Sequence, residues 1–157
     1  LGKAVMYLPG GIAMALFPMV AGNHSDGKNS AHLLIQAFGI TLILCTIGAI
    51  FYYLFSDLII VILYGEDYKM AAPLLKYFGF AMIPMGLILV AEHFLIAMGR
   101  VLFAYLFIII APFQLIAIYY FHESLINIIF IMSISGIILA IVGYSLLWRT
   151  FRNENTK

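Results

Sequence analysis

Long apolar stretches are the feature that most limits what this chain can fold into. From residue 74 to residue 148, only short polar links interrupt them. Hydrophobic residues make up 65% of the 157-residue sequence and charged residues only 10%. Soluble domains contain about 25% charged residues, and a chain this short has too small an interior to hide so much apolar surface. The chain is therefore predicted to be an integral membrane protein.

The length of these stretches predicts helices rather than strands. A membrane-spanning helix needs about 20 mostly apolar residues, whereas a spanning strand needs only about 9–11. Periodicity cannot decide between the two in runs this apolar. The predicted fold class is all-α, a polytopic transmembrane helical bundle. Residues 1–157 would form a single transmembrane domain with spans at about 4–22, 31–55, 74–98, 101–121 and 125–148.

A polar interruption follows the second predicted span. Residues 31–64 are too many for one straight helix across a bilayer of about 30 Å, at about 1.5 Å per residue. Ser56 and Asp57 therefore predict a break, followed by a short apolar segment at the membrane surface. The sequence GEDYK at 65–69 then predicts a loop outside the membrane, where the chain turns back.

Lysine and arginine residues near the span ends predict the orientation, because cytosolic loops carry an excess of them. If the C-terminus is cytosolic, the bias is five to three. The cytosolic side then carries Lys28, Arg100, Arg149, Arg152 and Lys157, and the outer side carries Lys3, Lys69 and Lys76. We therefore expect a multi-pass protein of the cytoplasmic membrane, with 149–157 as a cytosolic tail. Because the sequence opens on Leu1 without a signal peptide, it is expected to be the end of a longer protein.

Small residues recur at helical spacing in three of the spans. Lipid provides no hydrophobic drive for helix association, so helices pack where small side chains let their backbones approach. The small residues therefore predict the contact faces of a bundle. They are Gly11, Ala15, Pro18 and Gly22 in the first span, Ala37, Thr41, Cys45 and Gly48 in the second, and Ser133, Gly136, Ala140 and Gly143 in the fifth.

One acidic residue lies inside a predicted span. Glu92 precedes Arg100 by eight residues, which is about 12 Å along a helix, and His93 follows it. An ionisable group in the membrane costs about 2.5–3.5 kcal/mol on insertion scales and usually faces a cavity or a partner. Glu92 and His93 are therefore candidates for the substrate pathway or for ion coupling. In the alternative interpretation, Glu92 reaches the inner interface and pairs loosely with Arg100 or His32.

Other kinds of chemistry have little support in the sequence. Histidines and carboxylates lack metal-ligand spacing, and no phosphate-binding glycine loop or nucleophile elbow occurs. Glu92 and His93 point about 100° apart on a helix and make a poor acid–base pair. A net charge of +1 gives no strong field to attract nucleic acid. We expect no metal, no cofactor and no catalytic residue, and the chain is not expected to be an enzyme.

Three motifs, in this order, resemble those of one transporter family. They are YLPGGIAMALFPMVAG at 7–22, LYGEDYKMAAPLLKYFGFAM at 63–82 and FLIAMGR at 94–100. On these motifs the chain resembles the C-terminal part of polysaccharide-biosynthesis flippases, which transport O-antigen and other lipid-linked oligosaccharides. These belong to the multidrug/oligosaccharidyl-lipid/polysaccharide exporter superfamily. The most diagnostic features are Phe17–Pro18 at the end of an apolar run and the LYG motif with its acidic residues.

The resemblance implies both a fold and an activity. Members have roughly 12 to 14 helices in two pseudo-symmetric lobes around a cavity, and these five spans would form most of the second lobe. The implied activity is flipping of a lipid-linked oligosaccharide, carried on polyprenyl pyrophosphate, to the outer leaflet in cell-surface polysaccharide or lipopolysaccharide biosynthesis. The implied partners are membrane lipid, that substrate and the missing N-terminal lobe.

This chain departs from the family pattern at two points. Glu92 and His93 stand where members are usually apolar or small, and the basic residues expected to meet the pyrophosphate are not visible in this sequence. Two alternatives stay open beside the flippase. A drug or cation antiporter of the same superfamily would need an acidic site such as Glu92. A membrane enzyme of polysaccharide assembly would be expected to have a large, charged external loop, whereas the longest loop predicted here has about ten residues. A membrane scaffold without transport activity also stays open.

Overall fold

A computed structural model describes the backbone of residues 7, 9–25, 31–99 and 102–154. The regular elements in these ranges are all helices, which confirms the predicted all-α class. In chain order they are α2 (Gly10–Ser25), α3 (Ala31–Tyr64), the 3₁₀ helix η1 (Glu66–Ala71), α4 (Ala72–Ala97), α5 (Leu102–Tyr120) and α6 (Leu125–Glu154).

Three of the helical segments are long and apolar enough to cross a membrane. They are His32–Tyr64, Glu66–Ala97 and Leu125–Arg149. Two further apolar helices, Gly10–Val20 and Tyr105–Tyr120, are shorter. Part of the first predicted span (residues 4–6 and 8) lies outside the described residues. The last helix continues through Arg149 to Glu154, so most of the predicted polar tail is helical.

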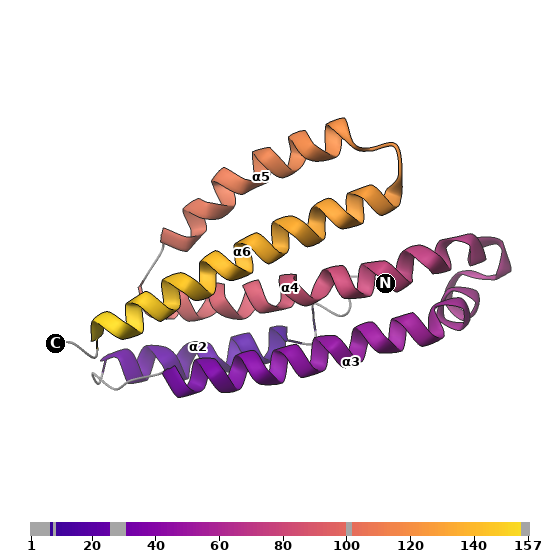
Figure 1. Ribbon diagram of the computed structural model, residues 1–157. Helices are drawn as coiled ribbons and strands as arrows, with labels where there is room; N and C mark the ends of the chain where they lie inside the picture. The colour runs from indigo at the N-terminus through magenta and orange to yellow at the C-terminus, as the bar shows by residue number, and fades with distance from the viewer. Residues whose placement is uncertain (1–6, 8, 26–30, 100–101, 155–157) are drawn as a thin grey trace.

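The long helix α4 is the centre of the bundle. It packs along α3 and along α6, and α2 lies against both α4 and α3. α5 packs mainly on α6, on the side of α6 away from α3 (Figure 1). α4 can occupy the centre because its buried residues are distributed around most of its circumference, as expected of a helix that is apolar all round.

The two ends of the bundle are formed by different connections. The end of α2, the start of α3 and the ends of α4 and α6 lie together on the left of Figure 1, and the α3–α4 and α5–α6 turns lie on the right. Exposed aromatic side chains occur near both ends. They are Tyr105 and Trp148 near the first, and Tyr64, Tyr68, Tyr119 and Tyr120 near the second. Such aromatic residues are enriched at the two membrane–water interfaces.

The helix α3 changes direction at Phe55. The φ of −113° and ψ of 16° at this residue leave the helical region, next to the predicted break at Ser56–Asp57. The chain nevertheless stays helical to Tyr64, so the break is a kink rather than an end. Just beyond it, Asp57 forms an ion pair with Lys76 Nζ of α4 at 3.4 Å. The location of residues 56–64 at a membrane surface stays a prediction.

The GEDYK motif at 65–69 forms the turn between α3 and α4; its location outside the membrane stays a prediction. Gly65 has a φ of +91°, which residues with a side chain rarely adopt, and Glu66 then begins η1. The helix α4 follows directly, with Pro73 in its first turn. Proline is tolerated there because its missing N–H would have no partner within the helix anyway.

Two of the three predicted contact faces are buried. In α3, Ala37, Thr41 and Cys45 are buried and Gly48 is half-buried. In α6, Gly136, Ala140 and Gly143 are buried and Ser133 is half-buried. The helices approach closely at these residues. A Cβ placed on Gly136 would lie 3.3 Å from Pro84 Cγ of α4.

The contact face predicted for α2 was wrong. Gly11, Ala15 and Pro18 are exposed, whereas Ala13 and Val20 are buried. Ala13 packs in a cluster with Ala37 of α3 and Val90 of α4. Residues two apart on a helix point about 200° apart. Because Ala13 faces α3 and α4, Gly11 and Ala15 lie on the opposite face of α2, away from the bundle.

Candidate functional site

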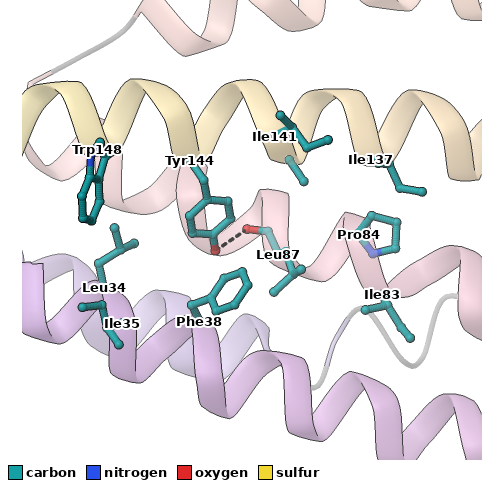
Figure 2. A pocket seen from close by; sticks show the side chains of 11 residues that line it. Leu34, Ile35, Phe38, Ile83, Pro84, Leu87, Ile137, Ile141, Tyr144 and Trp148 are labelled. Atoms are coloured by element: carbon teal, nitrogen blue, oxygen red, sulfur yellow. Dashed lines mark hydrogen bonds between the residues drawn. The ribbon is translucent and has the colours of Figure 1, made fainter.

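A pocket of about 580 Å³ lies between α3 and α6, over α4. It lies within the part of the bundle where the three long apolar helices meet, and Figure 2 shows its side chains converging from all three. Its lining residues are Leu34, Ile35 and Phe38 of α3, Ile83, Pro84 and Leu87 of α4, and Ile137, Ala140, Ile141, Tyr144 and Trp148 of α6. The lining is almost entirely apolar, as is typical of pockets that bind small apolar molecules.

Tyr144 carries the polar contact inside this pocket. Its hydroxyl donates a hydrogen bond to the backbone carbonyl of Leu87 at 3.3 Å, which joins α6 to α4. Its ring meets Phe38 of α3 edge-on, with ring centroids 4.8 Å apart. One side chain therefore contacts both neighbouring helices in the middle of the pocket (Figure 2).

Pro84 lines the pocket on α4, toward the end opposite Trp148 (Figure 2). Because proline lacks a backbone N–H, it removes one hydrogen bond from the interior of α4. Its ring packs at Gly136 of α6. The Cβ atom of a larger residue at position 136 would lie only 3.3 Å from Pro84 Cγ. This close approach fixes how near α6 lies to α4, while the rings of Phe38 and Tyr144 meet between α3 and α6.

Trp148 lies at one end of the pocket. Its side chain is 72% exposed, and in Figure 2 it lies beside Leu34 and Ile35 of α3. The exposed, positively charged Arg149 follows it. The pocket therefore runs from the apolar middle of the bundle to an end that carries an indole N–H, whereas Arg149, about 100° around α6 from Trp148, is not among its lining residues.

The two residues proposed from sequence lie elsewhere on α4. Glu92 and His93 are both half-buried, and neither belongs to the described lining of the pocket. Glu92 follows the lining residue Leu87 by five positions, which places it about 140° around the helix. The structure therefore does not bring Glu92 to the pocket, and its role stays a prediction.

His93 has a well-defined partner on its own helix. Its Nδ1 lies 2.8 Å from the carbonyl oxygen of Leu89. Because a carbonyl oxygen only accepts, Nδ1 must carry the hydrogen, and Nε2 is the acceptor of the neutral ring. Among the described side chains no ion pair forms with Glu92. Arg100, its predicted interfacial partner, lies outside the described residues.

Metal-binding chemistry is not indicated in the part of the chain that the structure describes. No group of three or more histidine, cysteine or carboxylate side chains there could hold a metal ion. The aromatic pocket, in contrast, was missed by sequence reasoning. Phe38 lies in one apolar run, and Tyr144 and Trp148 lie in another of similar appearance. Only the packing of α3 and α6 on the same helix, α4, brings them together.

Comparison with protein-family models, with curated proteins and with solved structures finds no match for this chain. The case for a function therefore rests on the motifs of the sequence and on the geometry described above.

Proposed function

We propose that the chain forms part of a membrane transporter that flips a lipid-linked oligosaccharide, carried on polyprenyl pyrophosphate, across the cytoplasmic membrane. Transport would follow alternating access, with two lobes rocking around a central site. The observation that carries the proposal is the ordered set of motifs that resembles the flippases. In its support, the LYG motif lies where two long apolar helices, α3 and α4, are joined by Gly65 and η1.

The packing of the bundle is compatible with a lobe that moves as a unit. α2, α3 and α6 all pack on α4, so a displacement of α4 would carry the other three helices with it. Prolines lie inside three of the helices, at Pro18, Pro84 and Pro112. Each removes a backbone hydrogen bond, and bent helices are common around transport cavities.

The test is a flipping assay in sealed vesicles. The full-length protein, containing this chain, would be reconstituted with a fluorescent polyprenyl-pyrophosphate-linked sugar, and the labelled lipid reaching the opposite leaflet would be measured over time. We expect faster flipping than in protein-free vesicles, and no flipping by residues 1–157 alone, because one lobe cannot alternate. Flipping at the protein-free rate by the full-length protein would contradict the proposal.

A second candidate is a drug or cation antiporter of the same superfamily. The observation that favours it is Glu92, a half-buried carboxylate in a segment long and apolar enough to span a membrane. A carboxylate there could take up a cation or proton in one state of the transporter and release it in the other.

The substitution Glu92→Gln tests whether the Glu92 carboxylate couples transport to a cation or proton, or has only a structural role. Transport by the full-length protein would be measured across pH at matched expression, with Glu66→Gln as the control because Glu66 is an exposed carboxylate of η1. Coupling through Glu92 predicts a lower rate and an altered pH dependence for Glu92→Gln alone. If both variants keep the original rate and pH profile, Glu92 has no coupling role.

A further inference from the structure

We propose that the pocket between α3 and α6 binds a hydrocarbon chain of an anionic phospholipid from the surrounding leaflet. This lipid would be a bound component of the bundle, whichever substrate the transporter moves. The inference therefore goes beyond the proposed function and does not depend on it.

The first argument concerns what surrounds the pocket. Every lining residue falls within one of the three segments that are long and apolar enough to cross a membrane, His32–Tyr64, Glu66–Ala97 and Leu125–Arg149. On the rim of the pocket, Ile35, Ile137 and Ile141 are exposed. With these segments in a bilayer, the pocket opens to hydrocarbon, and an apolar pocket offers water too few polar partners.

The second argument concerns the shape of the pocket. Pro84 packs on Gly136 at one end, and Tyr144 is held by the Leu87 carbonyl and by the ring of Phe38 in the middle. These contacts fix the positions of the walls. A side chain in a packed interior cannot simply move to fill the remaining space, so a flexible chain from outside is the suitable occupant.

The third argument concerns the length of the pocket. On α6 its lining runs from Ile137 to Trp148, which is about 16 Å at 1.5 Å per residue. The hydrocarbon core of a bilayer is about 30 Å thick, so the pocket covers about one leaflet. This extent matches the chain of a phospholipid whose headgroup lies at the Trp148 end.

The fourth argument concerns charge at that end. Arg149 follows Trp148 and is exposed. His32 is also exposed, and it precedes the lining residue Ile35 by three positions, so the two share a face of α3. The start of α3 and the end of α6 lie at the same end of the bundle (Figure 1). Arg149 lies about 100° around α6 from Trp148 and does not line the pocket, but its long side chain can extend to a headgroup at the membrane interface. An arginine and an indole ring at the same interface suit an anionic phosphate headgroup.

Photolabelling tests the proposal. The purified protein in detergent micelles, where bulk lipid is scarce, would be titrated with phosphatidylglycerol that carries a diazirine midway along one acyl chain. Labelled peptides would be located by mass spectrometry. We expect saturable labelling of the α3 and α6 segments that line the pocket. Unlabelled phosphatidylglycerol should compete with this labelling better than phosphatidylcholine does.

Two variants and a control make the test specific. Ala140→Phe fills the pocket from within, and Ile141→Trp narrows it from its exposed rim, which provides a second route if the first variant does not fold. Each should lower labelling about fivefold or more, as loss of about 1 kcal/mol of binding would. Ile138→Phe adds similar bulk to an exposed α6 position outside the lining and should leave labelling unchanged.

Three outcomes would overturn the proposal. Labelling spread evenly over the exposed faces of α3, α5 and α6 would show that no site exists. Competition by polyprenyl phosphate but not by phosphatidylglycerol would assign the pocket to the chain of the transported lipid. Labelling elsewhere on the protein, with none on the α3 and α6 segments that line the pocket, would show that another helix covers it.

Discussion

Gly86 of α4 is predicted to be a glycine that cannot be enlarged without loss of stability. A Cβ atom at this position would lie 2.8 Å from Cys45 Sγ of α3 and 3.1 Å from Pro9 Cγ. Both distances are well below the optimum of about 3.5–4.0 Å for non-bonded carbon contacts. Gly86 therefore allows the backbones of α3 and α4 to approach, as small residues do at helix contacts in membranes.

The cost of Gly86→Ala follows from two opposing effects. Overpacking a tight interior costs about 1–3 kcal/mol, whereas replacing glycine by alanine inside a helix gains up to about 1 kcal/mol. Gly39→Ala in α3 isolates the packing effect, because nothing lies within 4 Å of a Cβ placed there. Gly86→Ala should therefore have a free energy of unfolding about 1–3 kcal/mol below that of Gly39→Ala.

Steric trapping in bicelles would measure both free energies of unfolding. In the double variant Gly86→Ala/Cys45→Ala the sulfur atom is gone, and we expect recovery of about 1 kcal/mol beyond additivity, within the usual range for residues in contact. Recovery should be incomplete, because Pro9 still lies close to the new methyl group. Equal stabilities for Gly86→Ala and Gly39→Ala would refute the close approach of α3 and α4 at this point.

Three further predictions concern the polar contacts and the orientation of the chain. Tyr144→Phe removes the hydrogen bond from α6 to the backbone of α4 and should lower the free energy of unfolding by about 0.6 kcal/mol, the average for such bonds in membranes; a loss above about 2 kcal/mol would contradict this. Asp57→Asn breaks an ion pair between partly exposed side chains and should change stability by less than about 1 kcal/mol, measured in the same way. A cysteine at position 67 in a Cys45→Ala background should react with an impermeant thiol reagent from outside the cell; reaction from the cytosolic side alone would overturn the predicted topology.

The sequence alone determined the helical class and the main turn. Apolar runs of about 20 residues leave only helices able to satisfy their backbone hydrogen bonds in lipid, and GEDYK interrupts these runs with a glycine that can adopt a positive φ. The small residues of α3 and α6 also marked contact faces correctly. Close backbone approach in a membrane requires small side chains at those positions whatever the partner helix is.

Only the tertiary structure decided which other faces are buried and where the pocket lies. A helix that is apolar all round has no polar face to indicate which side packs inward. The sequence therefore could not tell that Ala13, rather than Gly11 and Ala15, turns toward α4. Leu34, Leu87 and Tyr144 are far apart in the sequence, and their meeting depends on how α3 and α6 both pack on α4. For the same reason, the sequence marked Glu92 by its charge but could not show that it points away from the pocket.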